Sequence, residues 1–385
     1  MSKKRAKAAP ARKLGDQFDL CYLTVDSVAE GVGSSQIIPL LEILAKSGLD
    51  ISLVSYEKKT PSQRIYEKMR ESGIEWKPLE FKPGYRQLPS RLDEMRRSIP
   101  GCNLIHARSD FPAFSAITSH VAPVIWDVRS LWADQKAFTE ENNLKKILIR
   151  GFRVFEDFAS KRAAGMSTLT NAVVPVLESR HKKVPSLRTV VPTAVDLDRF
   201  VFSGRIPQPI KGLYSGTYSS YYDLELSNQF VKELNNQKAV EVHWARPQES
   251  SRKSLMAGET HTFTLSQNEM PKILSDYGFG ISICRADAGP SLTGAMPTKI
   301  AEFLATGRPV VVNAGLGDLD NYLAEFNAGV IVTKESAELG VTALELLELL
   351  NDPGTPLRCR SLAEKYFDIK KGAIKYLDLY SRILN

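Results

Sequence analysis

The sequence has little of what marks a disulfide-linked, zinc-binding or membrane-spanning protein. It contains four cysteines in 385 residues, and none of them form the C-x-x-C pairs of metal or redox sites. We expect all four to be buried free thiols, as is typical of a reducing compartment. No run of 18 apolar residues is present, so no transmembrane helix is predicted. The N-terminus lacks the apolar core of a secretory signal, which favours a cytoplasmic location.

Acidic residues are absent from the first 15 positions. Six of the seven net positive charges come from basic residues there, namely Lys3, Lys4, Arg5, Lys7, Arg12 and Lys13. We expect residues 1–15 to form a disordered basic tail. The rest of the chain is close to neutral, which argues against a nucleic-acid-binding domain, because such a domain carries a basic surface on its fold. The tail could contact anionic lipid at the inner face of the cell membrane, or it could serve only solubility.

Short apolar strands alternate with amphipathic helices twice along the chain, which predicts two α/β domains with parallel sheets. The first series has strands at 18–24, 50–55, 74–80, 103–106, 123–127, 166–170 and 188–191 and helices at 35–47, 62–72, 90–98, 111–120, 144–164 and 171–180. A proline-bearing linker at 191–209 follows. The second series begins at Lys211, with strands near 240–244, 260–264, 279–283, 309–312 and 329–332. We expect an N-terminal domain at 16–200 and a C-terminal domain at 201–366.

Residues 297–306 have the clearest local pattern. Apolar residues at helical spacing predict a helix that begins in its first turn with Pro297 and precedes a β-branched strand. A helix N-terminus and a lysine both attract phosphate, and an acidic side chain one turn later can accept the hydroxyls of a ribose. An ordinary surface helix with one charge pair fits the local sequence equally well. The candidate ligand-binding residues are Pro297, Thr298, Lys299 and Glu302.

The run from Ser291 to Val311 resembles the nucleotide-sugar site of the GT4-type glycosyltransferases. The segments 315–318 and 327–329 continue the likeness. The resemblance implies the GT-B fold, an α/β architecture of two Rossmann-like doubly wound domains that face each other across a cleft. It also implies that Glu302 holds the donor ribose, that Lys299 and the helix start stabilise the leaving diphosphate, and that the closing helix, 367–385, packs on the first domain.

The sequence departs from this family at two places. Gly294 stands where the family has the first of two glutamates, and Thr217 stands where an arginine usually follows Ser215 and Gly216. The backbone near Thr293 and Gly294 would then contact the donor. Other cations must meet the diphosphate charge, and the candidates beside Lys299 are Arg246 and Arg285.

Gly31, Val32 and Gly33 follow the first strand and directly precede a helix. In the family this loop borders the donor diphosphate, and glycines allow backbone amides to approach a phosphate closely. Taken alone, the pattern also fits a plain strand-to-helix turn. Gln36 occupies the place of a third glycine, which argues against an NAD site.

Two further loops carry candidate catalytic residues. His106 and Arg108 lie at the end of one predicted strand, and Asp127 and Arg129 lie at the end of the next. Many family members have a histidine in such a loop, whereas here Arg108 or Asp127 occupies the position and could orient the acceptor. His106 lies one step earlier and also fits a core residue. Asp127 and Arg129 equally fit a structural ion pair.

Two D-x-D triplets, at 196–198 and 318–320, have a spacing found in metal sites. The first lies in the linker, and the second opens a helix, where an acidic residue caps well. We therefore predict no metal ion and no cofactor. The helix dipole and Lys299 would neutralise the diphosphate.

Residues 144–153 combine apolar residues at helical spacing with four cations. This pattern fits an interfacial helix for a lipid-linked acceptor, or a helix that buries its apolar face and solvates its basic side.

The sequence and its resemblance to this family together predict a metal-independent hexosyltransferase that uses a nucleoside diphosphate sugar and a glycan or lipid-linked acceptor. The resemblance implies that the anomeric configuration is retained. Cell-surface polysaccharide or glycolipid synthesis is the expected setting. The alternatives are a nucleotide-sugar epimerase on the same fold, a catalytically silent glycosyltransferase-like subunit, or a nucleic-acid-binding protein that uses its basic tail.

Overall fold

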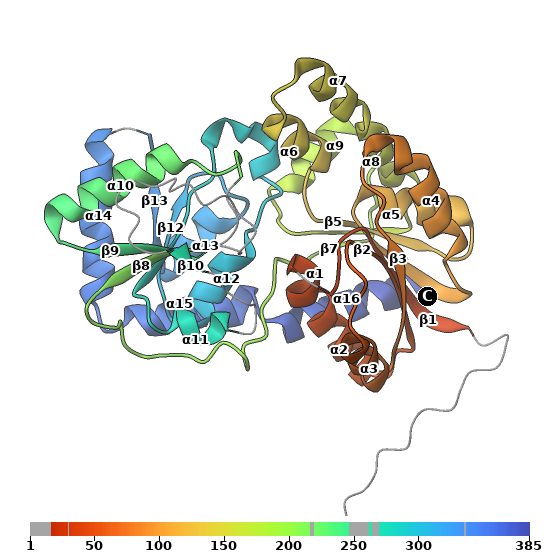
Figure 1. Cartoon of the computed structure of the whole chain (residues 1–385), viewed down its shortest axis with the longest axis horizontal. Helices are drawn as coiled ribbons and strands as arrows, with labels where there is room; N and C mark the ends of the chain where they lie inside the picture. Colours follow the sequence, from red (N-terminus) through yellow and green to blue (C-terminus); the bar gives the residue numbers. More distant parts are fainter. Residues whose placement is uncertain (1–16, 30, 216–218, 246–261, 264–268, 335) are drawn as a thin grey trace, which may run out of the picture.

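The computed structural model describes residues 17–29, 31–215, 219–245, 262–263, 269–334 and 336–385. The predicted tail at 1–15 and the site candidates Gly216 and Arg246 lie outside these ranges, as does Thr217. Within them the chain forms two α/β domains side by side, each built on a parallel sheet (Figure 1). None of the helices in these ranges is long and apolar enough to cross a membrane.

The first domain has a seven-stranded sheet in the order β3-β2-β1-β4-β5-β6-β7. Its strands are β1 (Phe18–Thr24), β2 (Ile51–Glu57), β3 (Ile74–Glu80), β4 (Cys102–Arg108), β5 (Val124–Val128), β6 (Gly165–Thr168) and β7 (Arg188–Val190). Every residue of β2 and β5 is buried. Such continuous burial is expected of a parallel sheet that is covered by helices on both faces.

The helices of the first domain depart from the predicted ones in three places. They are α1 (Gly31–Gln36), α2 (Ile38–Lys46), α3 (Gln63–Glu71), α4 (Leu88–Arg97), α5 (Asp110–Ser119), α6 (Trp132–Thr139), α7 (Asn143–Gly151), α8 (Arg153–Arg162) and α9 (Val173–Arg180). The helix predicted at 35–47 is two helices, and the helix predicted at 144–164 divides near Phe152. Helix α6 was not predicted, because its sequence has no clear apolar period.

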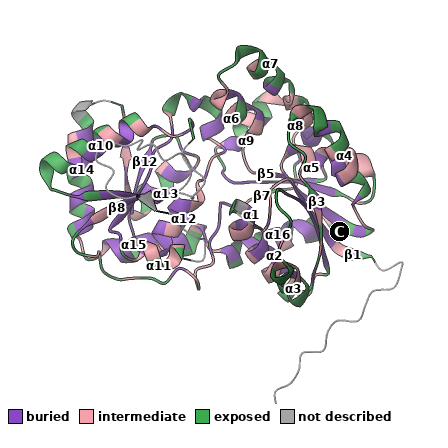
Figure 2. Ribbon diagram, viewed as in Figure 1, coloured by how far each residue is buried: buried purple, intermediate pink, exposed green. Residues whose placement is uncertain are grey.

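The second domain has a six-stranded sheet in the order β10-β9-β8-β11-β12-β13. Its strands are β8 (Lys211–Ser215), β9 (Glu241–Ala245), β10 (Thr262–Phe263), β11 (Phe279–Ser282), β12 (Val310–Asn313) and β13 (Gly329–Val332). Its helices are α10 (Leu224–Gln237), α11 (Met270–Leu274), α12 (Thr298–Ala305), α13 (Leu319–Phe326), α14 (Ser336–Asn351) and α15 (Thr355–Tyr366). The strands consist largely of buried residues, and the helices contain both buried and exposed ones (Figure 2).

The last helix, α16 (Ile369–Leu384), returns to the first domain. Tyr376 and Tyr380 pack there in one apolar cluster with Leu20 and Tyr22 of β1. The Tyr380 hydroxyl lies 2.7 Å from Nδ1 of His106, a fully buried residue of β4. The predicted α/β fold with two doubly wound domains is therefore confirmed.

A close contact fixes α12 on its sheet. A Cβ atom at Gly280 in β11 would lie 2.2 Å from Cδ2 of Phe303, whose ring is buried. Only a glycine lets the ring of Phe303 approach the strand so closely.

We expect Gly280→Ala to destabilise the protein by about 1–3 kcal/mol, because the added methyl group overpacks the core and forces α12 outward. Urea unfolding measures this change. The matched control is Gly340→Ala in α14, where an added Cβ would meet no atom within 4 Å. The control should leave stability unchanged or raise it by up to about 1 kcal/mol. Equal effects of the two substitutions would contradict the packing argument.

Candidate functional site

Sheet topology places a cleft between the domains. The strand order reverses between β1 and β4 in one sheet and between β8 and β11 in the other. Loops that leave parallel strands at such points diverge and open a crevice where ligands bind. A cleft of about 2260 Å³ lies here and is lined from both domains, by Gly31 and Arg108 on one side and by Ser215 and Lys299 on the other.

Helix α12 supplies the polar wall of the second domain. Ile300, Phe303 and Leu304 bury its apolar face in the domain core. Pro297 has an extended backbone and lies just before the helix, so the prediction that it forms part of the first turn is wrong. The cleft is lined by the four residues that the sequence singled out here, Pro297, Thr298, Lys299 and Glu302.

The ammonium group of Lys299 lies between two aromatic rings. Its Nζ is 4.1 Å from the ring centre of Tyr222 and 4.7 Å from that of Tyr214. The buried Nζ makes no hydrogen bond in the described part of the chain. Burial lowers the pKa of Lys299 to about 8, although Cys284 and Glu302 act in the opposite direction. Aromatic faces stabilise a cation without accepting a conventional hydrogen bond, so this group can still bind an anion.

Glu302 lies one turn further along α12. Burial raises the pKa of its carboxyl group to about 7, and the nearby charges of Arg199 and Lys299 oppose this rise. Among the residues that the structure describes, no donor forms a hydrogen bond with this carboxylate. A partly desolvated carboxylate with free lone pairs can accept two hydroxyl groups, and Glu302 faces the same cleft as Lys299.

The glycine segment forms the opposite wall and is the start of α1, not a loop. Gly31 has a φ of 64°, a left-handed conformation that suits glycine. A Cβ atom at Gly33 would lie 2.0 Å from the carbonyl oxygen of Ser27, so the backbone there has room only for glycine. Both glycines line the cleft, and Val32 lies between them in α1.

Sequence reasoning missed Glu57, which holds the segment before α1. Its buried carboxylate accepts hydrogen bonds from the Val28 amide at 2.9 Å and the Ser55 hydroxyl at 2.6 Å, and a further one from the Ser27 hydroxyl. These partners fix the backbone that leads into the glycines. Ser27 lies 30 positions and Val28 lies 29 positions before Glu57 in the sequence, so no local pattern could reveal these contacts.

The candidate catalytic residues divide into two groups. Arg108 and Arg129 line the cleft, whereas Asp127 and His106 are buried behind them. Asp127 lies 3.8 Å from the guanidinium group of Arg108, 3.6 Å from that of Arg129 and 3.4 Å from His106. Asp127 therefore supports the two arginines and does not itself reach the cleft, and His106 is a core residue.

Charge holds this buried network together. Burial acts to raise the pKa of Asp127, but Arg129, His106 and Arg108 keep it below its ordinary value. The Ser167 hydroxyl also donates a hydrogen bond to Asp127 at 2.8 Å. Arg108 also donates a hydrogen bond from its Nε to the carboxylate of Asp26 at 2.9 Å. The carboxylate thus remains charged and keeps both arginines in place at the cleft wall.

Three predicted donor-binding residues lie elsewhere. Arg285 pairs with Asp287 at 2.6 Å and covers the ring of Phe138, outside the cleft lining. The carbonyl group of Thr293 accepts a hydrogen bond from the Thr170 hydroxyl of the first domain. A Cβ at Gly294 would lie 3.2 Å from Val173. This loop packs against the start of α9 in the first domain, and neither Thr293 nor Gly294 lines the cleft.

Asp318 strengthens the same contact. Its carboxylate accepts hydrogen bonds from the backbone amides of Asn171 at 2.7 Å and Ala172 at 2.9 Å, just before α9 in the other domain. It forms no side-chain cap on its own helix α13, so the expected local cap is wrong. Among the described residues, no group of three or more histidine, cysteine or acidic side chains is arranged to hold a metal ion.

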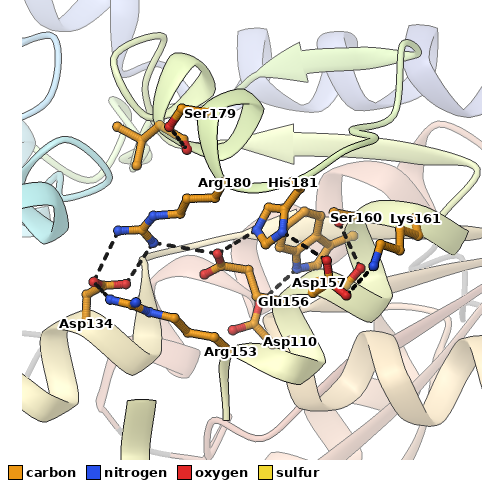
Figure 3. Close-up of polar contacts among 12 residues, drawn as sticks. Asp110, Asp134, Arg153, Glu156, Asp157, Ser160, Lys161, Ser179, Arg180 and His181 are labelled. Carbon is orange, nitrogen blue, oxygen red and sulfur yellow. Dashed lines mark hydrogen bonds and ion pairs between the residues drawn. The ribbon is translucent and has the colours of Figure 1, made fainter. Parts of the chain in front are cut away.

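A second polar network lies behind the first-domain wall (Figure 3). Asp134 of α6 binds Arg180 at 2.8 Å and also Arg153, and Glu156 lies 2.8 Å from His181. The hydrogen bond with Glu156 raises the pKa of His181, although burial opposes it. These ion pairs tie α6 to α8 and to the end of α9. Trp132 and Lys136 of α6 line the cleft, so the network positions part of its wall.

We expect Asp127→Asn to destabilise the protein by about 3–5 kcal/mol, because it removes a buried counter-charge from Arg108, which keeps only Asp26, and from the partly buried Arg129. The pKa of Asp127 is depressed in the fold, so this difference should persist above about pH 4 and shrink as the pH falls below it. Urea unfolding at several pH values measures it. The control Asp198→Asn, at an exposed ion pair with Lys370, should cost less than about 1 kcal/mol. A similar small cost at Asp127 would contradict the network.

Comparison with known proteins gives the fold a name. The sequence matches no protein-family model and no curated protein sequence. Sucrose-phosphate synthase from Thermosynechococcus elongatus is structurally similar, with a TM-score of 0.65 at 12% identity over 95% of this chain and 99% of that chain. Anabaena HepE in complex with UDP-glucose is also similar, with a TM-score of 0.66 at 12% identity over 95% of this chain and 98% of that chain. WaaG, a glycosyltransferase involved in lipopolysaccharide biosynthesis, has a TM-score of 0.63 at 13% identity over 94% of this chain and 99% of that chain. The chain therefore has the GT-B fold.

Proposed function

We propose that the protein is a retaining GT4-type glycosyltransferase, which moves a hexose from a nucleoside diphosphate sugar to a glycan or lipid-linked acceptor. One observation carries this proposal. Lys299 and Glu302 lie on a single turn of α12 and both face the cleft between two doubly wound domains. A cation beside a helix start and a carboxylate one turn later match the diphosphate and the ribose of one ligand.

The diphosphate would lie at the start of α12. No side chain caps this helix at Pro297, so its first amide groups and the positive end of its dipole are available to an anion. Lys299 adds a full charge in a desolvated setting, where electrostatic interactions are stronger than in water. Stabilising the charge that develops on the departing diphosphate is the main catalytic task of such an enzyme, and it requires no metal ion here.

The first domain would bind the acceptor and complete the phosphate site. Arg108 and Arg129 approach the cleft from the carboxyl ends of β4 and β5. Aromatic rings of Tyr85, Phe111 and Trp132 line the same wall, and such rings stack on sugar rings or contact lipid. HepE, whose structure contains UDP-glucose, has a similar fold, which supports a nucleotide sugar as the donor.

A catalytically silent subunit is the second candidate. The observation that favours it is the position of Gly294, which packs on the first domain where the family has a glutamate near the donor. Incubation with a nucleotide sugar and no acceptor separates the two. Slow release of free sugar supports an enzyme, and an intact donor after long incubation supports a silent subunit.

We expect Glu302→Ala to weaken UDP binding by about 2–3 kcal/mol, because two charge-assisted hydrogen bonds to the ribose are lost. Isothermal titration calorimetry measures this loss. The matched control is Glu225→Ala, at an exposed position of α10, which should leave the affinity unchanged. An unaltered UDP affinity in Glu302→Ala would contradict the assigned role.

The affinity for UDP-glucose should depend on pH in a bell-shaped manner. Glu302, with a pKa of about 7, loses its negative charge as the pH falls below this value, and Lys299, with a pKa of about 8, loses its positive charge as the pH rises above it. The tightest binding should therefore occur between these values. The esterified diphosphate of this ligand does not titrate there. Glu302→Gln should flatten the acid limb and Lys299→Met the alkaline limb. A constant wild-type affinity from about pH 6 to about pH 9 would contradict both assignments.

A further inference from the structure

Helix α7 presents an apolar stripe to solvent. Leu144, Ile147 and Leu148 share one face at helical spacing, and they are 79%, 67% and 51% exposed. Val154, at the start of α8, is 60% exposed. Of the nine residues in α7, only Ile149 is buried, and the helix appears largely green at the outer end of the first domain (Figure 2). The interpretation that this helix buries its apolar face is therefore wrong.

Basic residues flank the stripe. Lys145, Lys146 and Arg150 lie on the same short helix, which has no acidic residue. Helix α14 offers a contrast, since its exposed Val341 and Leu344 lie among glutamates and no basic residue is present in that helix. An apolar stripe alone is ambiguous, whereas a stripe bordered by cations is complementary to an anionic lipid surface, where the headgroups attract the charges and the acyl region accepts the side chains.

We propose that α7 docks the protein on an anionic membrane, with Leu144, Ile147 and Leu148 inserted among the lipids and the three basic side chains at the headgroups. A protein partner fits the stripe less well. Stable protein interfaces engage roughly 20–30 residues a side and favour aromatic anchors. The exposed stripe has three aliphatic residues with one more beside it, and none of these is aromatic.

The position of α7 connects docking to the cleft. Phe152 lies between α7 and α8, and its ring centre is 5.4 Å from that of Tyr85 and 6.1 Å from that of Trp132, both of which line the cleft. A docked α7 thus brings the acceptor wall close to the lipid surface. The further step, in which the docked protein reaches an acceptor carried by a lipid, rests on the proposed function. The docking itself does not.

The test is sedimentation of the full chain with vesicles, without donor or acceptor, so that docking and glycosyl transfer can fail separately. One set of vesicles contains phosphatidylcholine alone, and the other contains equal amounts of phosphatidylcholine and phosphatidylglycerol. The stripe variant is Leu144→Ser with Ile147→Ser and Leu148→Ser, and the charge variant is Lys145→Gln with Lys146→Gln and Arg150→Gln. All six positions lie at or near the surface, so both variants should melt as the wild type does.

The matched control is Val341→Ser with Leu344→Ser, which removes exposed aliphatic side chains of similar size from α14 in the second domain. We expect the wild type and the control to bind the anionic vesicles, and to bind phosphatidylcholine vesicles far more weakly. The stripe variant and the charge variant should each lose about tenfold or more in affinity for the anionic vesicles.

Two results would overturn the proposal. One is binding that the stripe variant retains in full, which would assign any lipid contact to another part of the chain, such as its basic N-terminal residues. The other is the absence of anionic-vesicle binding by the wild type. If the wild type then self-associates in light scattering and the stripe variant does not, the stripe is a contact between copies of this chain.

Discussion

The charge of Lys299 is the constraint on which the candidate site depends. A buried ammonium group is costly unless other groups compensate for its lost hydration. Here the rings of Tyr214 and Tyr222 stabilise it in part, and the Nζ still makes no hydrogen bond within the described ranges. The group lies at the edge of a large cleft, beside a helix start without a side-chain cap. These conditions favour an anionic ligand. Glu302, one turn later, can accept hydrogen bonds from hydroxyl groups of the same ligand.

The remainder of the fold keeps this arrangement in place. Phe303 locks α12 against the strand at Gly280, and Glu57 fixes the segment that leads to the glycines on the opposite wall. Asp127 holds the two arginines of the first domain at the cleft. Asp318 joins the domains through the backbone amides that precede α9. Each of these groups is buried, and none needs to touch a ligand to affect its binding.

The sequence predicted the parts of the structure that local patterns determine. The β-branched run at 310–312 and the turn containing Lys299 and Glu302 were found because all their determinants lie within a few residues. Contacts between distant segments could not be found in this way. The packing of Arg285 on the ring of Phe138, the packing of Gly294 on Val173, and the bonds of Asp318 to the other domain depend on where the chain returns in space. Helix α6 was missed because tertiary contacts, including the ion pair of Asp134 with Arg180, replace an apolar period.

A crystal structure of the protein with UDP tests the central claim most directly. The account predicts that the diphosphate lies at the start of α12, with an oxygen about 3 Å from the Nζ of Lys299 and both ribose hydroxyls bonded to Glu302. A nucleotide bound away from α12, or one that leaves Lys299 between its two tyrosine rings without a phosphate contact, would contradict it.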